Sequence, residues 1–375
     1  LRCLVGSEMC IRDSSNNDNS MNKTGIKPFS CTYSPNLAQL LWKLKCTLAI
    51  STYQAGKVIF ICPAAENRLT QLPRNFRKPM GIAVSGRKMA IATKSKVMVF
   101  ANANKIANRY PAKPNTYDAL YLPRATYYCG NLDVHDLWWG KEHLYAINTR
   151  FSCLSVVTDN FNFEPIWKPN FITELRPTDR CHLNGLTMID GEPTYVSALG
   201  KSNEKEGWRA TKLTGGIVVN IKTNEIVADG LPMPHSPRYY DGKLYILLSA
   251  TGQLACIDTE NNSYEVVTQL NGFARGMTKY DKYLFIGLSK VRKKNKPFSD
   301  MPIAPKALNA GVVVVDMETK KVVGQISYLS SVEEIYDVQV LPNIMRPNIV
   351  HPENDIHELA IDTPFAKFWR KPMKK

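Results

Sequence analysis

The sequence lacks any run of about 18 apolar residues, so it offers no segment that could form a transmembrane helix. It also lacks a CxxC pair, and its nine cysteines are dispersed along the chain. Dispersed cysteines argue against both a zinc ribbon and a disulfide framework. We therefore expect a globular protein from a reducing compartment, and we predict a cytoplasmic location without membrane association.

The common catalytic signatures are missing as well. No GxSxG, HExxH, Walker or dinucleotide-binding fingerprint occurs. Cys181 stands next to His182, but adjacent strand residues point to opposite faces, which argues against a Cys–His dyad. The sequence thus identifies no enzyme class and leaves open whether the protein is an enzyme.

Acidic residues are fewer than basic ones: 33 Asp and Glu stand against 48 Lys and Arg, for a formal net charge of +15. Positive charge gathers at residues 292–294 and 370–375. Neither cluster is accompanied by a stacking-aromatic motif or a docking helix, so we expect no nucleic-acid partner. A basic channel mouth can, however, concentrate small anions by electrostatic focusing.

What the sequence does contain is one pattern that occurs six times, a polar turn followed at once by a short alternating strand. The copies read RKPMGIAV, LDVHDLWW, CHLNGLTM, PHSPRYYD, GFARGMTK and EEIYDVQV. The fifth residue of each copy serves as the reference position: Gly81, Asp136, Gly185, Arg238, Gly276 and Asp337. Steps of about 40–60 residues between such copies are typical of a β-propeller.

Three further strand signals follow each of the first five copies. The sixth copy, at Asp337, has none, whereas residues 46–74 carry three strand signals with no first strand before them. A C-terminal strand that completes the N-terminal blade would remove two open sheet edges. We therefore predict an all-β fold, a six-bladed β-propeller of four-stranded blades closed by pairing of N- and C-terminal strands.

The predicted propeller spans residues 46–342 and is flanked by two other segments. Residues 1–20 include LVGSEMCIRDS, which resembles translated sequencing-adapter read-through; we expect this segment to be an artefact and disordered, and the protein to start near Met21. Residues 21–45 are predicted to hold a short capped helix that begins at Ser34-Pro35. Residues 343–375 are predicted to form a C-terminal basic tail that contains a short helix and ends in the solvated run FAKFWRKPMKK.

The concentrated chemistry lies just before each first strand, where a propeller places residues at one mouth of its central channel. Three positions before the reference stand Lys78, Asp133, His182, His235, Phe273 and Glu334. One position before it stand Met80, His135, Asn184, Pro237, Arg275 and Tyr336. Loops after the second strands open on the same face and add Arg150, Trp208 and Arg209.

Three interpretations compete for His135, His182 and His235. They could hold a divalent metal ion, because three protein ligands with an open position is the catalytic zinc arrangement. They could instead serve as hydrogen-bonding and acid–base residues of a small-molecule site, or they could tie strand ends to loops. His182 and His235 share one frame of the repeat and His135 lies two residues later, which weighs against the metal.

Two arginines are candidates for binding an anion. Arg150 and Arg275 could clamp a carboxylate or phosphate with paired hydrogen bonds, or they could pair with Asp133 or Glu334 across the channel. A further alternative places calcium among Asp133, Asn184 and Glu334, as in lactonase-type propellers.

The chain from about residue 29 to residue 347 resembles an uncharacterised family of bacterial conserved hypothetical proteins with a propeller-like domain of unknown function. The resemblance is carried by STYQAGK, DVHDLWWG, NTRFSCL, DRCHLNGL, EGWR, MPHSPR, RGM, GLSKVR and YDVQVLP. One departure is LLSATGQL, where Ala250 stands in place of an expected glycine. The resemblance implies a propeller and a shared site built from His135, Asn148, Arg150, His182, Asn184, His235 and Arg238.

We expect a soluble propeller that binds a small polar or anionic ligand at one mouth of its channel. The alternatives are a metal-dependent hydrolase or lyase using the same histidines, and a protein-interaction scaffold. The predicted metal ligands are His135, His182 and His235. The predicted ligand-binding residues are His135, Asn148, Arg150, His182, Asn184, Trp208, Arg209, His235, Arg238, Arg275 and Glu334.

Overall fold

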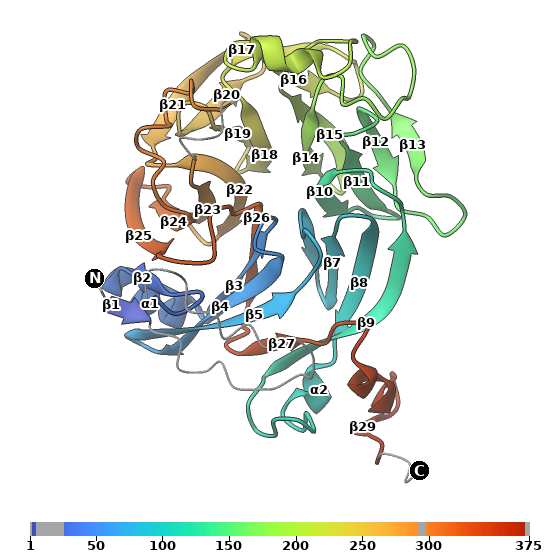
Figure 1. Cartoon of the computed structure of the whole chain (residues 1–375), viewed down its shortest axis with the longest axis vertical. Helices are drawn as coiled ribbons and strands as arrows, with labels where there is room; N and C mark the ends of the chain where they lie inside the picture. The colour runs from blue at the N-terminus through green and yellow to red at the C-terminus, as the bar shows by residue number, and fades with distance from the viewer. Residues whose placement is uncertain (1, 5–25, 292–297, 372–375) are drawn as a thin grey trace.

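The computed structural model describes residues 2–4, 26–291 and 298–371. Six antiparallel four-stranded sheets stand around a central axis like the blades of a propeller (Figure 1). The prediction of a six-bladed, all-β ring is confirmed. The basic clusters at 292–294 and 374–375 lie outside the described residues.

The blades are numbered from the N-terminal one, and each is given from its inner to its outer strand. Blade 1 consists of β26 (Asp337–Pro342), β3 (Cys46–Thr52), β4 (Lys57–Ala65) and β5 (Arg68–Asn75). Blade 2 consists of β6 (Ile82–Ser85), β7 (Lys88–Ala92), β8 (Lys96–Asn102) and β9 (Ala119–Tyr128). Blade 3 consists of β10 (Val134–Trp139), β11 (Leu144–Asn148), β12 (Cys153–Val156) and β13 (Glu164–Trp167).

The second half of the ring repeats this order. Blade 4 consists of β14 (Leu183–Ile189), β15 (Glu192–Ala198), β16 (Gly216–Asn220) and β17 (Ile226–Leu231). Blade 5 consists of β18 (Pro234–Tyr240), β19 (Lys243–Leu248), β20 (Gln253–Asp258) and β21 (Ser263–Gln269). Blade 6 consists of β22 (Phe273–Tyr280), β23 (Tyr283–Ser289), β24 (Gly311–Asp316) and β25 (Lys321–Tyr328).

Blade 1 joins residues from the two ends of the ring. Strand β26 pairs antiparallel with β3 in unbroken register, from Asp337 opposite Ser51 to Pro342 opposite Cys46. This pairing confirms the predicted closure. The ring therefore has no open end, and only the outer strand of each blade has an edge that is not paired within the blade.

Apolar side chains from neighbouring blades form the core between the sheets. All seven residues of β3 are buried, and Leu48 and Ile50 belong to one cluster with Phe285, Val312 and Val314 of blade 6. Branched and aromatic side chains suit such doubly covered strands because each face of the sheet packs against another sheet.

Helix α1 (Pro35–Leu44) covers the outside of the ring next to blades 1 and 6 (Figure 1). It buries Leu37, Ala38 and Leu41. The helix and its proline start agree with the prediction, but Ser34 makes no capping hydrogen bond. Its hydroxyl instead accepts from the Gln325 backbone N–H at 3.0 Å, which ties the helix start to β25.

Short elements extend two of the blades. Strands β1 (Arg2–Leu4) and β2 (Cys31–Tyr33) add to the outside of blade 6. Strand β1 belongs to the segment 1–20, which we expected to be disordered. The rest of that segment lies outside the described residues. Helix α2 (Asn104–Ala107) precedes β9.

The C-terminal segment packs on blade 2, which differs from the solvated tail that we predicted. Strand β27 (Pro347–Ile349) pairs with β9, and the 3₁₀ helix η2 (Asp355–Leu359) leads to the hairpin of β28 (Ala360–Asp362) and β29 (Lys367–Trp369). The Trp369 indole donates a hydrogen bond to the Ile106 carbonyl at 3.0 Å. The Trp369 ring also packs on the apolar cluster that includes Ile106 and Ala107, so it anchors the segment to α2.

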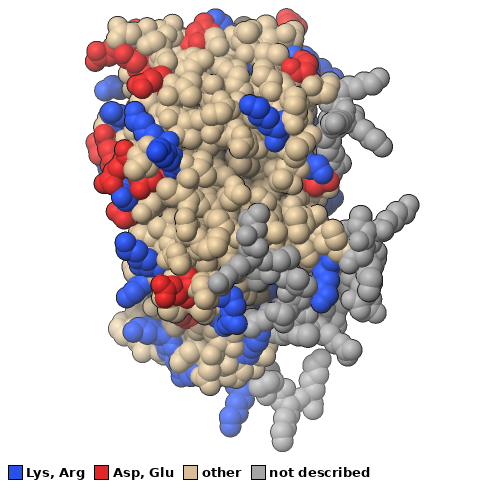
Figure 2. All heavy atoms as spheres, turned by 90° about the vertical axis from the view of Figure 1, so that its left-hand side faces the viewer, with Lys and Arg blue, Asp and Glu red and all other residues tan. Residues whose placement is uncertain are grey.

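One side of the molecule carries both signs of charge. Figure 2 shows Lys and Arg side chains interspersed with Asp and Glu on the face seen there, around a broad uncharged middle. Among the described residues, no helix is long and apolar enough to cross a membrane.

Candidate functional site

The inner strands meet at a narrow part of the channel, here called the waist, which contains the six reference positions. Around the ring these positions alternate between a charged residue in blades 1, 3 and 5 and a glycine in blades 2, 4 and 6. The charged residues are Asp337, Asp136 and Arg238, and the glycines are Gly81, Gly185 and Gly276.

The glycines are needed because the neighbouring charged blade approaches them closely. A Cβ atom at Gly81 would lie 3.0 Å from the Asp136 Cα, and one at Gly276 would lie 2.6 Å from the Asp337 Cα. Gly276 also has a φ of +78°, which favours glycine. Three side chains, rather than six, therefore fill the waist.

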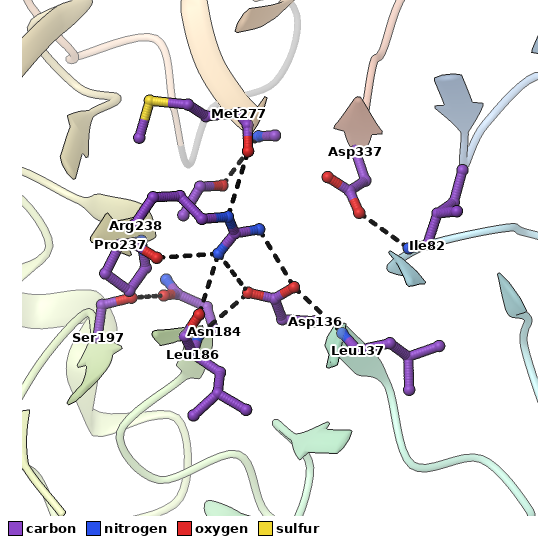
Figure 3. Close-up of polar contacts among 12 residues, drawn as sticks. Ile82, Asp136, Leu137, Asn184, Leu186, Ser197, Pro237, Arg238, Met277 and Asp337 are labelled. Carbon is purple, nitrogen blue, oxygen red and sulfur yellow. Dashed lines mark hydrogen bonds and ion pairs between the residues drawn. The ribbon is translucent and has the colours of Figure 1, made fainter. Parts of the chain in front are cut away.

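Arg238 and Asp136 form a buried ion pair across the waist (Figure 3). The two guanidinium Nη atoms donate to the two carboxylate oxygens at 2.9 and 3.3 Å. Arg238 also donates to the carbonyls of Leu186, Pro237 and Met277 at 3.0–3.2 Å. All nitrogen atoms of this guanidinium are therefore occupied, and Arg238, predicted to contact a ligand, contacts protein instead.

Each charged waist residue also bonds to the next blade. Asp136 accepts from the Leu186 N–H of blade 4 at 3.0 Å, and Asp337 accepts from the Ile82 N–H of blade 2 at 2.8 Å (Figure 3). Arg238 donates to the Met277 carbonyl of blade 6. Burial, and next the nearby Asp136 carboxylate, raise the pKa of Asp337 to about 7.

The mouth lies one to three residues before the waist in each repeat and gathers aromatic and imidazole rings. The rings of His135 and His182 meet edge to face with centroids 4.8 Å apart. Tyr336 lies 5.2 Å from the other side of His135, and Trp208 lies 4.4 Å from His182. The predicted convergence of His135, His182 and Trp208 is therefore present in the structure.

Bulges in the inner strands help to turn these side chains. The register shifts between Val134 and Leu137 in β10, and between His235 and Arg238 in β18. A bulge lets neighbouring residues point in directions that a regular strand would separate. His135 can thus reach the mouth while Asp136 reaches the waist.

His135 and His235 have equivalent surroundings, which their sequence frames do not indicate. The Nδ1 of His135 donates to the Asp133 carbonyl at 3.0 Å and lies 2.7 Å from the Thr149 hydroxyl. The Nδ1 of His235 donates to the Met233 carbonyl at 3.1 Å and lies 2.8 Å from the Ser249 hydroxyl. In both cases the hydroxyl follows the histidine by 14 residues and itself donates to a carbonyl of the next blade.

His182 is held by a carboxylate. Its Nδ1 donates to the Asp179 Oδ2 at 2.8 Å, and the Trp208 indole donates to the same oxygen at 3.2 Å. Both residues have positive φ, 48° for Asp179 and 52° for His182. Left-handed backbone at residues other than glycine is uncommon and clusters at functional sites.

Burial lowers the pKa values of two of these imidazoles. The pKa of His135 falls to about 4, and that of His235 falls well below its usual value. Nearby Arg275 lowers both further. Since carbonyls accept from each Nδ1, the two neutral rings carry their hydrogen on Nδ1 and leave the Nε2 lone pair available.

Arg275 and Glu334 pair at the edge of the mouth, as predicted for the alternative in which the arginine has a protein partner. The Arg275 guanidinium lies 3.8 Å from the Tyr336 ring centroid. A hollow of about 270 Å³ adjoins this pair and is also lined by Phe273, Ser289 and Lys290. A larger hollow, of about 870 Å³, lies on the outer rim and shares no residue with the mouth.

Several buried polar atoms around the mouth have no hydrogen-bond partner within the described residues. Four of them can donate: Asn148 Nδ2, Arg150 Nε, Arg275 Nε and the Tyr336 hydroxyl. The fifth, Asp179 Oδ1, is an acceptor. Buried polar groups are nearly always paired, so a concentration of unpaired ones calls for an explanation.

Two other predicted residues have protein partners. Asn184 donates to the Pro234 carbonyl at 2.9 Å and accepts from the Ser197 hydroxyl at 2.6 Å, so its amide ties blades 4 and 5. Arg209 bonds to Glu206 at 3.1 Å, and its guanidinium lies 4.5 Å from the centroid of the Trp208 ring. Arg209 is therefore next to the mouth, in contact with Trp208.

No group of three or more His, Cys, Asp or Glu side chains within the described residues is placed to hold a metal ion. The predicted histidine set is therefore not grouped in this way. The calcium set, Asp133, Asn184 and Glu334, includes an asparagine and stays a prediction. Burial raises the pKa of Cys181 to about 12, which keeps its thiol protonated beside His182.

Three residues around the mouth escaped the site prediction. Asp179 lies in the connection between blades 3 and 4, outside the repeat, so no pattern marked it. Thr149 and Ser249 could have been found, because each follows a mouth histidine by 14 residues and precedes a loop.

Comparison with known proteins adds a family but no activity. A family model described as Domain of unknown function (DUF4915) matches residues 35–350. No curated protein matches the chain. Among solved structures, a chain from a structure titled "Crystal structure of Nidogen/Laminin Complex" aligns with a TM-score of 0.48 and 11% identity, covering 80% of this chain and 99% of that one.

Proposed function

This chain belongs to the family described as Domain of unknown function (DUF4915), and from that premise we propose that its channel mouth binds a small anionic ligand that also carries hydroxyl or amine donors. The observation that carries the proposal is the set of unpaired buried polar atoms around the three histidines. Such atoms are costly to bury, and a bound ligand would supply their missing partners.

The imidazoles define what the ligand must donate. His135 and His235 are neutral near pH 7 and hydrogen-bonded through Nδ1, so each offers Nε2 as an acceptor. His182 is hydrogen-bonded through Nδ1 to Asp179, so its Nε2 is the ring nitrogen left for a ligand. Acceptors of this kind suit ligand hydroxyl or amine groups.

The arginines define the ligand's charge. Arg150 and Arg275 each have an unpaired Nε, and Tyr336 has an unpaired hydroxyl. A guanidinium matches the planar geometry of a carboxylate or phosphate, and the water-poor surroundings strengthen that contact. Glu334 already occupies one side of Arg275, which favours a singly charged anion over a highly charged one.

A panel of hydroxycarboxylates and sugar phosphates, screened by thermal shift and then by calorimetry, tests the proposal. The variant Arg275→Gln should weaken binding of a hit by roughly tenfold or more, because a charged hydrogen bond contributes about 1.5–3 kcal/mol. Arg124→Gln is the matched control, since Arg124 lies on β9 at the outer side of blade 2 and is bonded to Asp362 at 3.4 Å. Equal affinity in the wild type and Arg275→Gln would contradict the proposal.

A metal-dependent reaction is the second candidate, because histidines pinned through Nδ1 by oxygen atoms resemble the supporting contacts of metal-bound imidazoles. Metal analysis of protein reconstituted with zinc, manganese or iron distinguishes the two. A stoichiometric metal that is lost in His135→Gln and His182→Gln would favour the metal candidate over the metal-free ligand site.

A further inference from the structure

The larger hollow on the outer rim is separate from the channel mouth. It measures about 870 Å³, and its lining comes from the end of β9, the connection from β12 to β13 and the start of β13. Figure 1 shows β9 and β13 as the outer strands of blades 2 and 3. None of its lining residues belongs to the mouth. Any ligand of this hollow, here called the rim groove, would bind independently of the proposed channel ligand.

Aromatic rings dominate the rim groove. Tyr127, Tyr128, Phe161 and Phe163 line it, and Tyr128 and Phe161 are 71% and 67% exposed. Exposed aromatic rings that share one hollow are more informative than isolated ones, because they present several π faces to one volume.

The loop that carries Phe161 is tied to the rest of the groove. The Asn162 side chain donates to the Tyr128 carbonyl at 3.2 Å, which joins the loop to the end of β9. The Phe163 ring packs on Phe151 with centroids 4.9 Å apart, which anchors the loop to blade 3. These contacts hold both walls of the groove in place before any ligand arrives.

The charge of the groove is opposite to that of the chain. The chain has a formal net charge of +15, yet the charged residues that line the groove are Asp159 and Glu164. Neither forms an ion pair with another described residue. A ligand with positive charge would gain from both carboxylates and from the negative faces of the rings.

The protein itself already places a cation on one of these rings. The Lys96 Nζ lies 5.0 Å from the centroid of the Tyr128 ring, within the range of a cation–π contact. Tyr128 can therefore accept an ammonium group, and an added ligand would share the ring with Lys96 or displace it.

We propose that the rim groove binds an organic cation, a quaternary or protonated alkylammonium, between Tyr128 and Phe161 with Asp159 and Glu164 as its counter-charges. The alkyl groups of such a cation contact the ring faces, while its charge is balanced by the carboxylates. A hydrated metal cation would gain little from the rings, and an anion would be repelled by the carboxylates.

Binding of choline to the full-length protein, followed by ligand-observed and ¹⁵N-detected NMR, tests the proposal. The uncharged carbon analogue 3,3-dimethylbutan-1-ol has the same shape and serves as the matched ligand. Choline should bind and the analogue should bind at least about fivefold more weakly, as expected for a contact that depends on charge.

Three variants locate the binding. Phe161→Ala and Asp159→Asn should each weaken choline binding by about fivefold or more, whereas Phe365→Ala, which removes a 98% exposed ring elsewhere, should leave it unchanged. Lys96→Gln should strengthen binding, because it removes the competing ammonium, and a gain in affinity cannot result from misfolding.

Four outcomes would overturn the proposal. They are no choline binding, equal binding of choline and its neutral analogue, choline binding that is indifferent to Phe161→Ala, and binding of a neutral oligosaccharide such as maltohexaose in place of choline. None of them would bear on the channel mouth, which is tested with anions and with Arg275→Gln.

Discussion

The waist and the mouth are adjacent parts of one channel wall, but they differ in whether their buried polar atoms have hydrogen-bond partners within the protein. At the waist the nitrogens of Arg238 and the oxygens of Asp136 all have partners within the protein. At the mouth, Arg275 and Arg150, which comes from the loop after β11, each bury an Nε with no partner among the described residues. The paired groups join the blades, whereas the unpaired groups are those that the proposed ligand would contact.

This contrast separates two kinds of residue that the repeat alone treats alike. Arg238 and Arg275 both lie in an inner strand, β18 and β22, and both were predicted to contact a ligand. Arg238 contacts three carbonyls and a carboxylate, so it joins blades 3, 4, 5 and 6. Among the described residues, Arg275 pairs with one partly exposed glutamate, Glu334, and its Nε has no hydrogen-bond partner. The waist is therefore expected to control stability and the mouth to control binding.

The largest expected effect is on stability, from removal of the waist carboxylate. Asp136→Ala leaves the Arg238 charge buried without its partner and also removes an acceptor for the Leu186 N–H. The free energy of unfolding should fall by about 3–5 kcal/mol, measured by urea denaturation. Lys201→Ala, which breaks the exposed pair with Asp229, should cost at most about 1 kcal/mol. Similar losses in the two variants would contradict a structural role of the waist pair.

The next effect tests the alternation of glycine with charge. Gly276→Ala and Gly130→Ala introduce the same strain, because both glycines have a φ of +78°. A Cβ at Gly130 meets nothing within 4 Å, whereas one at Gly276 would crowd the Asp337 backbone. Gly276→Ala should therefore be less stable than Gly130→Ala by about 1–3 kcal/mol in thermal or urea unfolding. Equal stability of the two variants would show that the waist accommodates a Cβ atom at position 276 without crowding the Asp337 backbone.

Waist and mouth should also differ in the sign of their pH dependence. The folded pKa of Asp337 is raised to about 7, so the folded state holds a proton that the unfolded state releases, and this contribution to stability is lost as the pH rises from about 4 to 7. The folded pKa of His135 is lowered to about 4, so its contribution is lost as the pH falls from about 6.5 to 4.

Two variants separate these opposing slopes. In urea titrations at several pH values, Asp337→Asn should remove the loss of stability on the alkaline side, and His135→Gln should remove the loss on the acid side. A pH profile of Asp337→Asn that runs parallel to the wild-type profile would mean that the waist carboxyl stays ionised.

The smallest expected change in stability comes from the mouth. His182→Gln should alter the free energy of unfolding by about 1 kcal/mol or less, because the side chain is partly exposed and makes one polar contact, to Asp179. The same variant should reduce binding of any anion found by the screen, which a purely structural residue would not do. A loss of stability as large as that of Asp136→Ala would place His182 with the waist.

The ring was predictable from the sequence because the repeat spacing and the strand patterns are local properties of the chain. The closure by Asp337 opposite Ser51 followed from counting, since one end lacked the strands that the other end carried in excess. The convergence of His135, His182 and Trp208 followed from their places in the repeat.

What could not be predicted depends on contacts between blades. The equivalence of His135 and His235 comes from strand bulges and from hydroxyls 14 residues away, which shift the spatial frame relative to the sequence frame. Asp179 lies outside the repeat, and only its hydrogen bond to His182 identifies it. The end of the chain was predicted to be solvated because most of its residues are basic. The sequence did not show that Trp369, within this basic run, would donate a hydrogen bond to α2.

The pairing of β26 with β3 also determines when the protein can become a closed ring during its synthesis. Asp337 and Ser51 are partners in one sheet although 285 residues separate them in the chain. At about 5–20 residues per second, a ribosome needs roughly 15–60 seconds to span that interval. Throughout this time the inner edge of β3 has no strand beside it, so a nascent chain is most exposed to mispairing at that edge, and the last blade to be finished is the first that was begun.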